Sequence, residues 1–167
     1  MNKFTFYHIH NKYIGFLYSA DKRVQHNKDQ HRPYVGIVLQ IKQFNYFVSL
    51  ESPKPNYNKL RSSGPTLKLD EGKLGIMGFN NMIPVPDAAL LSFNFENIKD
   101  EKYRNLLYNQ LQYCNKNKDL IYRRAASIYK KAISGKILHY KKVCCDFKKL
   151  ERMSLKYNPS YKRKPSK

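Results

Sequence analysis

Acidic residues are scarce in this chain, which has 12 Asp and Glu against 32 Lys and Arg in 167 residues. The carboxylates are dispersed, and no DxD or ExxH pair that could begin a divalent-metal site occurs, which disfavours two-metal nuclease chemistry. The formal charge of +20 opposes compaction unless a polyanion neutralises it with release of counterions. The composition therefore predicts a phosphate-rich partner.

Cysteine is also rare, and the three that occur are Cys114, Cys144 and Cys145. They form no CxxC pair, and adjacent cysteines rarely bridge each other. A structural zinc site needs two ligand pairs at short spacing, and none of the five histidines supplies the missing pair. We therefore expect reduced, buried thiols, no metal and no cofactor.

Long apolar runs are absent, because no stretch approaches the roughly 20 residues that a membrane span requires. Residues 1–7 alternate as in a strand and lack the apolar stretch and cleavage site of a signal peptide, so a cytoplasmic location is expected. No Gly-Lys-Ser/Thr phosphate loop occurs, and Gly72, Gly75 and Gly78 do not open a helix. They are therefore interpreted as hairpin glycines.

The pattern of apolar residues predicts one α+β domain over residues 1–157, with a mainly antiparallel sheet backed by helices. A basic, disordered tail is expected at 158–167. Strands are predicted first along the chain and most helices after them. The expected strands are 3–8, 34–41, 46–50, 66–69, 73–79 and 82–86; helical periodicity covers 11–20, 103–114 and 121–132, and resumes after a cap at Asp146.

The positive charge is unevenly distributed along the chain. Residues 1–99 hold 13 basic and 7 acidic side chains, net +6, whereas residues 100–167 hold 19 and 5, net +14. The C-terminal part is therefore the expected docking surface for a polyanion. A polar loop from Lys22 to Pro33 carries His26, His31 and Arg32, and it could present them to a ligand.

RNA can be cleaved without a metal, because its own 2′-hydroxyl can attack the adjacent phosphate. A base, an acid and a cation at the phosphorane suffice for this chemistry. His8 and His10 share one face of a predicted strand, but two solvent-facing imidazoles are the simpler interpretation. The segment Ser52-Pro53-Lys54 places a hydroxyl and an ammonium on a rigid turn at a strand end, although spacing alone also fits a plain proline turn.

Five short segments must be considered together. They are 32–39, 46–54, 74–75 with 81–86, 107–112 and 143–151. Each is a weak signal alone, but in this order they resemble the ToxN/AbiQ family, the toxins of type III toxin-antitoxin systems. The resemblance covers about residues 3–152.

This resemblance implies a metal-independent endoribonuclease with a compact, bent antiparallel sheet flanked by helices, similar to the Kid/MazF toxins. It further implies cleavage of adenine-rich cellular and phage messenger RNA to 2′,3′-cyclic phosphate and 5′-hydroxyl ends. The expected partner is an antitoxin RNA of repeated pseudoknot units, which inhibits the toxin, is cut by it and assembles with it into a closed ring. Such pairs act in phage defence by abortive infection.

The resemblance also implies a set of catalytic residues. Ser52 is placed near the attacking hydroxyl, Lys54 on the phosphate and Tyr13 along the cleavage groove, while Arg32 stands where some members have Lys. Glu51 replaces a small hydroxyl residue of the family; it could act as a base, pair with Lys54 or point away, because neighbours on a strand alternate faces. Glu51→Ala is expected to keep activity, and Ser52→Ala and Lys54→Ala to lose it.

Basic and tyrosine side chains are expected to hold RNA beside this groove. Those in the region 121–132 lie largely off its apolar stripe, so a packed core and an outward cationic face are compatible. Tyr108 also fits a phenol of the helix core. The full predicted set is Lys12, Tyr34, Tyr57, Lys59, Arg61, Tyr108, Tyr113, Arg123, Arg124, Lys130, Lys131, Lys136, Lys141 and Lys142.

Two rival interpretations stay open at this point. A non-catalytic RNA-binding protein would need only the high charge and the tyrosines. A MazF-like toxin restrained by a protein antitoxin would differ in its partner. The sequence does not assign the general acid.

Overall fold

Antiparallel pairing dominates the sheet of this protein, whose computed structural model describes residues 2–160. The strands are β1 (Thr5–Ile9), β2 (Tyr34–Ile41), β3 (Phe44–Glu51), β4 (Thr66–Lys68), β5 (Ile76–Gly78), β6 (Ile83–Pro84) and β7 (Leu90–Ser92). Their order is β4-β5-β3-β2-β1-β7, and β6 pairs with β3 beside β5. The predicted α+β class is confirmed, while most of the predicted tail, residues 161–167, lies outside the described part of the chain.

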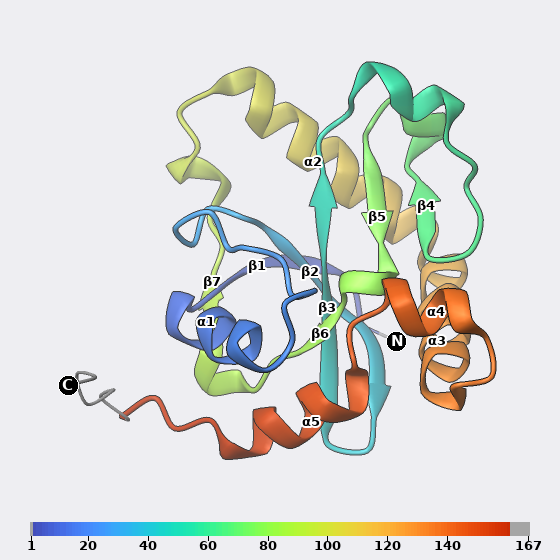
Figure 1. The fold of residues 1–167 in the computed structure, drawn as a ribbon. Coiled ribbons are helices and arrows are strands. Elements are labelled where there is room, and N and C mark those ends of the chain that lie inside the picture. Colours follow the sequence, from blue (N-terminus) through green and yellow to red (C-terminus); the bar gives the residue numbers. More distant parts are fainter. Residues whose placement is uncertain (1, 161–167) are drawn as a thin grey trace.

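Helices cover both faces of this sheet. In Figure 1, α1 and α5 lie in front of the strands, and α2 and α3 pass behind them. Within residues 2–160 no helix is both long and apolar enough to cross a membrane. The α-helices are α1 (Asn11–Ala20), α2 (Glu101–Lys116), α3 (Lys118–Ser134), α4 (Leu138–Val143) and α5 (Phe147–Lys156), and the 3₁₀ turns are η1 (Pro55–Lys59), η2 (Asp70–Gly72), η3 (Phe79–Asn81), η4 (Asp87–Ala89) and η5 (Phe95–Asn97).

Polar caps and one glycine set the ends of the long helices. The Asp100 carboxylate accepts a hydrogen bond from the Tyr103 backbone N–H at 3.1 Å and starts α2. Asp146 caps α5 in the same way, as predicted, by accepting from the Lys149 N–H at 3.1 Å. Gly135 ends α3 with a φ of 66°, a left-handed conformation that glycine adopts without steric cost.

The central hairpin of β2 and β3 aligns the two segments that matter for the site. Tyr34 of β2 lies opposite Ser49 of β3, so the residues just before β2 meet the residues that end β3. The predicted hairpin is confirmed, but its turn is shorter than expected, because Phe44 and Asn45 already belong to β3. Arg32 and Glu51 are thereby brought to the same end of the sheet.

A buried carboxylate joins this hairpin to the C-terminal helices. Glu151 on α5 is only 5% exposed, and its Oε1 accepts hydrogen bonds from the hydroxyls of Tyr46 at 2.9 Å and Tyr129 at 2.6 Å. Lys148 Nζ lies 3.1 Å from the other oxygen. Burial, with help from the Glu151 charge, raises the pKa of Tyr46. Both phenols therefore stay protonated and act as donors.

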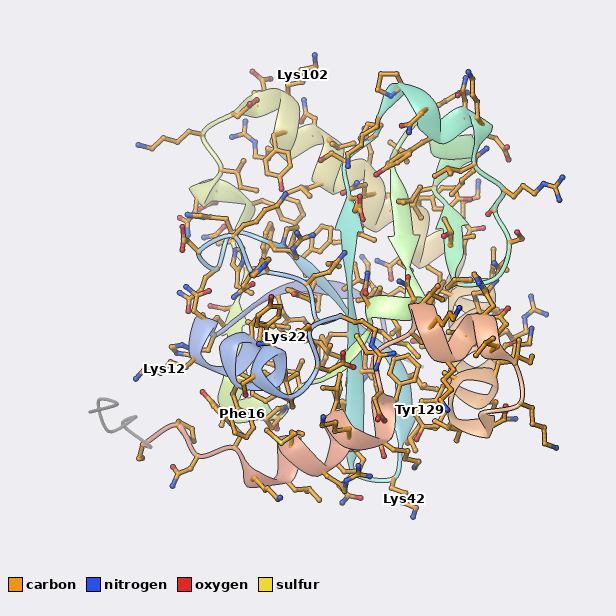
Figure 2. The ribbon with its side chains drawn as sticks, viewed as in Figure 1. Lys12, Phe16, Lys22, Lys42, Lys102 and Tyr129 are labelled. Carbon is orange, nitrogen blue, oxygen red and sulfur yellow. The ribbon has the colours of Figure 1, made fainter. Side chains whose placement is uncertain are left out.

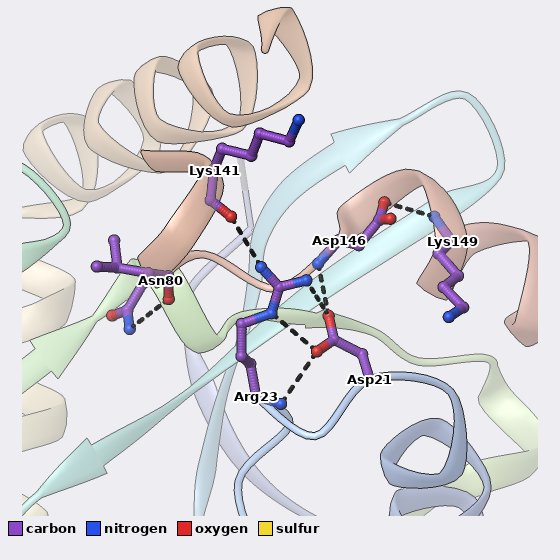
Figure 3. Close-up of polar contacts among 7 residues, drawn as sticks. Asp21, Arg23, Asn80, Lys141, Asp146 and Lys149 are labelled. Carbon is purple, nitrogen blue, oxygen red and sulfur yellow. Dashed lines mark hydrogen bonds and ion pairs between the residues drawn. The ribbon is translucent and has the colours of Figure 1, made fainter. Parts of the chain in front are cut away.

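A second polar junction ties the loop after α1 to the start of α5 (Figure 3). The buried Asp21 carboxylate accepts hydrogen bonds from Arg23 Nε at 2.9 Å and from the Asp146 backbone N–H at 2.7 Å. Arg23 in turn donates to the Lys141 carbonyl at 2.8 Å. The three cysteines, two of which lie just before Asp146, are free and buried, as predicted.

Asp21→Asn is expected to destabilise the fold by about 2–4 kcal/mol, because it removes the charge that Arg23 and the Asp146 N–H contact. Although burial raises the pKa of Asp21, the hydrogen bonds from Arg23 and Asp146 outweigh it and leave that pKa below its ordinary value. A lowered folded-state pKa gives stability that is complete above the unfolded-state value of about 3.9 and is lost as the pH falls below it. We therefore expect the difference in the free energy of unfolding between wild type and Asp21→Asn to be constant from about pH 7 downward and to shrink only near pH 3. Urea unfolding at a series of pH values measures this difference.

The exposed Asp87 provides the matched control for this measurement. Asp87→Asn also removes one carboxylate, but this carboxylate is not held at a buried junction. It is expected to change the free energy of unfolding by less than about 0.5 kcal/mol. Equal destabilisation by the two variants would contradict the role assigned to Asp21.

Candidate active site

The Ser52-Pro53-Lys54 turn lies between the end of β3 and the start of η1. Both Ser52 and Lys54 are exposed, and within the described chain the Ser52 hydroxyl makes no hydrogen bond that would occupy it. Lys54 has an extended backbone, and its carbonyl accepts from the Tyr57 N–H at 3.0 Å, which fixes the exit of the turn. A hydroxyl and an ammonium thus face solvent on a short, proline-limited segment, as predicted.

Glu51 and Tyr57 complete a polar cluster around the lysine. The Tyr57 hydroxyl donates to Glu51 Oε2 at 2.6 Å, and Lys54 Nζ lies 3.5 Å from the same oxygen. Glu51 is thus paired with Lys54 and does not point away from it. The Lys54 ammonium also lies 5.5 Å from the centre of the Tyr57 ring, a cation–π distance.

The charges in this cluster are set by their mutual contacts. Burial alone would raise the pKa of Glu51, but the Tyr57 hydroxyl, Lys54 and Arg32 together hold it below its ordinary value. The Tyr57 hydroxyl and then Glu51 raise the pKa of Lys54. At neutral pH the turn therefore presents a carboxylate and an ammonium. A carboxylate with a lowered pKa is a weak general base.

Two glycines and a buried amide support the turn from behind. Gly75, with a φ of +97°, packs so closely that a Cβ built on it would lie 1.8 Å from the Glu51 carbonyl oxygen. Gly72 has a φ of +91° and lies beside the Tyr57 backbone, although a Cβ built on it would meet the Tyr57 carbonyl oxygen at an ordinary contact distance of 3.4 Å. The buried Gln110 of α2 donates through Nε2 to the Leu74 carbonyl at 2.7 Å. Helix α2 thereby positions the segment against which the Ser52-Pro53-Lys54 turn rests.

Arg32 lies at the same end of the sheet, as the β2–β3 register requires. Its Nε donates to the His26 carbonyl at 2.9 Å, and this bond holds the side chain across the loop before β2. The guanidinium is close enough to Glu51 to help lower the pKa of that carboxyl. The structure therefore places Arg32 at the same end of the sheet as the cluster of Glu51, Lys54 and Tyr57.

Two residues expected at the RNA surface are buried instead, and this corrects their placement. Tyr13 is fully buried, its hydroxyl donates to the Pro84 carbonyl, and its ring packs edge-on against Tyr157 at 4.8 Å. It belongs to the apolar face that α1 turns toward α5, so it does not line an open groove. Tyr34, 2% exposed, is likewise a core residue of β2.

Tyr57 needs a similar correction. Its side chain is 6% exposed, so its ring is not available as a stacking platform for an unpaired base. Its hydroxyl is instead a partner of Glu51. The sequence contains a signal for this role, because a tyrosine six residues after a strand-end carboxylate can fold back onto it through a short 3₁₀ turn.

Most of the predicted basic residues are on the surface. Arg124 is an exception, because its NH1 donates to the Gly64 carbonyl at 3.0 Å and to the Thr66 carbonyl at 3.3 Å; it fastens α3 to β4. Tyr113 is half-buried against the core. RNA binding by the exposed residues stays a prediction. They are Lys12, Lys59, Arg61, Tyr108, Arg123, Lys130, Lys131, Lys136, Lys141 and Lys142.

The positive surface extends beyond the C-terminal helices. Figure 2 shows Lys12, Lys42 and Lys102 pointing outward at three different edges of the fold.

Among residues 2–160 no group of three or more His, Cys, Asp or Glu side chains gathers where it could hold a metal ion. The groups at the turn are an ammonium, a hydroxyl, a phenol and a carboxylate, and the Arg32 guanidinium lies at the same end of the sheet.

Comparison with known proteins identifies the family. A family model described as toxin ToxN of type III toxin-antitoxin systems matches residues 5–154. The chain belongs to the ToxN family. This match spans β1 to most of α5 and includes the Ser52-Pro53-Lys54 turn. It confirms the resemblance seen in the five sequence segments.

Curated ToxN relatives match over nearly the whole chain. Endoribonuclease ToxN from Bacillus thuringiensis subsp. kurstaki is 35% identical over 161 residues, which cover 91% of this chain and 83% of that protein. Endoribonuclease AbiQ from Lactococcus lactis subsp. lactis is 31% identical over 164 residues, covering 92% of this chain and 88% of AbiQ. The similarity therefore includes both the sheet and the C-terminal helices.

Solved structures of the family have the same fold. AbiQ, described as a lactococcal anti-phage endoribonuclease of the type III toxin-antitoxin system, superposes with a TM-score of 0.83 at 28% identity, covering 93% of this chain and 98% of that one. A structure described as showing selective toxin inhibition by a non-coding RNA pseudoknot gives a TM-score of 0.79 at 31% identity, with coverage of 93% and 98%. The ToxN fold predicted here is thus confirmed.

Proposed function

We propose that this protein is an endoribonuclease toxin that cleaves RNA without a metal ion. The observation that carries this proposal is the exposed Ser52-Pro53-Lys54 turn of a ToxN-family chain, with Arg32 at the same end of the sheet. The 2′-oxygen attacks the adjacent phosphorus while the bond from phosphorus to the 5′-oxygen breaks. The products are a 2′,3′-cyclic phosphate and a 5′-hydroxyl, and the proton lost by the 2′-hydroxyl is balanced by one gained at the 5′-oxygen.

The roles of the side chains follow from their charge and exposure. Lys54, held as an ammonium by Tyr57 and Glu51, neutralises the charge that grows on the phosphorane oxygens. Ser52 bonds the 2′-hydroxyl or a phosphate oxygen. Arg32 provides a planar, permanently charged second contact for the phosphate. Glu51 keeps the lysine in place rather than acting as the base, because its lowered pKa makes it a poor proton acceptor.

The proposed partner is an antitoxin RNA of repeated pseudoknot units. It would inhibit the toxin, be cut by it into units and close with it into a ring, and adenine-rich cellular and phage messenger RNA would be the substrates, in a phage defence that acts by abortive infection. This part of the proposal is supported by the family resemblance, by the pseudoknot inhibition described for a structural relative and by the charge of +20. A folded RNA can contact cationic side chains on several edges at once, as the distribution of lysines here requires.

Incubating the protein with single-stranded RNA in excess EDTA is the direct test of the chemistry. We expect discrete fragments that carry 2′,3′-cyclic phosphate and 5′-hydroxyl ends, because the attacking group belongs to the RNA and the charges come from side chains. An RNA of the same sequence with 2′-fluoro groups should bind but stay intact. Mass spectrometry of the ends identifies the products.

Each other outcome of this assay favours a rival function. Binding without any cleavage would favour the non-catalytic RNA-binding protein. Cleavage that stops in EDTA, or that leaves 5′-phosphate ends, would contradict attack by the 2′-hydroxyl. Cleavage by the expected chemistry that a co-expressed repetitive RNA does not inhibit would favour a toxin with a protein antitoxin.

A further inference from the structure

A cavity of about 550 Å³ opens on the face of the sheet that α2 covers. Its walls come from four separate segments: β1, the loop before β2, the stretch from β7 through η5, and the first turns of α2. This volume falls within the roughly 300–1,000 Å³ that is usual for small-molecule sites. The lining includes His8, His31, Phe93, Asn94, Asn97 and Tyr103.

Flat rings and free amide groups characterise the walls of this cavity. The His8 and Phe93 rings lie 5.0 Å apart at 40°, and Tyr103 contributes a phenol from α2. Asn94 uses its Oδ1 to accept from the Glu96 N–H at 2.9 Å, which leaves its amide nitrogen for a ligand. Aromatic surface combined with amide donors and acceptors is the chemistry that recognises an unpaired nucleobase.

The loop that closes one side of the cavity is strained. Lys28, Asp29 and Gln30 all have positive φ values, 47°, 52° and 67°, although none is glycine. Each such residue costs about 1–3 kcal/mol, and strain of this kind collects at functional sites. The loop is held in place because Gln30 Oε1 accepts from the Asn11 N–H at 3.0 Å. The fold thus maintains an unfavourable backbone where Asp29 and Gln30 line the cavity.

Arg32 connects this cavity to the catalytic turn. The positive charge of its guanidinium contributes to the lowered pKa of Glu51. The same charge opposes the rise that burial causes in the pKa of Tyr103. Arg32 directly follows His31, which lines the cavity. It also lies just before β2, whose Tyr34 is opposite Ser49 near the end of β3. The arginine therefore lies between the turn and the cavity. An RNA strand whose phosphate contacted Arg32 would therefore run past the cavity.

We propose that this cavity is a base pocket that receives one unpaired nucleobase of the bound RNA, next to the nucleotide that is cut. The inference rests on the RNA function proposed above. The base would lie against the Phe93 and Tyr103 rings, and the Asn94 and Asn97 amides would bond its edge. The pocket would thereby fix the register of the strand on the catalytic turn and contribute to the choice of cleavage site.

Removing bases one at a time tests this pocket by binding alone. The probes are four 2′-fluoro RNA hexamers, each made of a single kind of base. Each hexamer is compared with six versions of itself, in which one position after another lacks its base. For the preferred base, loss of one particular base should weaken binding by about 5-fold to 100-fold, the range expected for one stacked base. Because 2′-fluoro RNA cannot be cleaved by 2′-attack, the result does not depend on catalysis.

Asn97→Leu provides the matched variant, since Asn97 is exposed and lines the cavity. It should reduce binding of the intact hexamer and abolish the extra loss caused by the critical abasic position. Asn105→Leu, an exposed position on α2 outside the cavity lining, should leave that loss unchanged. Thermal unfolding of both variants confirms that the fold is kept.

The outcomes separate this inference from the proposed function. If no abasic position matters, or if its effect is the same in Asn97→Leu and wild type, the pocket does not hold a base, even if the protein cleaves RNA. A second outcome is that one abasic position weakens binding to wild type but not to Asn97→Leu, while RNA stays intact in EDTA. The base pocket is then supported, and the proposed nuclease chemistry is contradicted.

Discussion

Ser52→Ala and Lys54→Ala are each expected to lower the rate of RNA cleavage by about 10²–10³-fold, the usual cost of one group that stabilises the charge of a transition state. Both side chains are exposed, so neither loss should change the free energy of unfolding by more than about 0.5 kcal/mol. Single-turnover cleavage of a short RNA with protein in excess measures the effect on the chemical step. In cells the same variants should lose toxicity.

Glu51→Ala distinguishes a mechanism in which Glu51 is the general base from one in which it only holds Lys54 in place. Because Glu51 is already bonded to Tyr57 and paired with Lys54, and because its pKa is lowered, we expect cleavage to fall by less than about 10-fold. A dead Glu51 variant beside an active Ser52 variant would overturn the assignment and make the carboxylate the base. Lys42→Ala is the control for Lys54→Ala, because it also removes one positive charge but lies at the turn of the central hairpin, far from the site (Figure 2).

Gly75→Ala is expected to disable the site without touching any group that contacts RNA. The new methyl would lie 1.8 Å from the Glu51 carbonyl oxygen and 3.2 Å from the Ser52 carbonyl carbon, at a φ of +97°. Either the turn or β5 must move. Overpacking and a left-handed alanine together should cost about 3 kcal/mol of stability. Cleavage should fall at least about 100-fold, because displacements near 1 Å have effects of that size.

Gly15→Ala is the control for this substitution. Gly15 lies in α1, and a Cβ there would meet no atom within 4 Å. Alanine in place of glycine inside a helix should stabilise the protein by about 0.5–1 kcal/mol and leave cleavage unchanged. Urea unfolding and single-turnover cleavage of both variants, at a temperature where both are folded, complete the comparison. Wild-type cleavage by Gly75→Ala would show that the turn does not depend on its support.

Local signals were sufficient for much of the fold. The Asp146 cap, the stop at Gly135 and the β-branched runs of β2 and β3 each act within a few residues, so the sequence predicts them. Helix α4 escaped prediction because its six residues are too few to show a helical period. Strand β7 is no shorter than β4 and β5, but it pairs with the distant β1 and not across a glycine turn as they do. The existence of α4 and β7 depends on contacts with distant segments.

The candidate site was only partly predictable for a related reason. The Ser52-Pro53-Lys54 turn is contiguous, so its sequence shows it. Tyr13 was misplaced although the same periodicity that predicts α1 puts it on the apolar face with Ile14 and Leu17, all of them buried; here the pattern outweighs the family resemblance. Gln110 could be assigned to a helix face, but its bond to the Leu74 carbonyl, 36 residues away, is visible only in the folded chain.

The support of the turn by Gly75 and Gln110 has a consequence for synthesis of the toxin. A growing chain that has released β1 to β3 and the turn after them contains Arg32, Ser52 and Lys54, but not the helix whose amide holds the Leu74 carbonyl. The geometry of the turn is therefore incomplete until α2 has emerged and docked. If the turn cleaves messenger RNA as proposed, a nascent chain without α2 would leave the message on its own ribosome uncut.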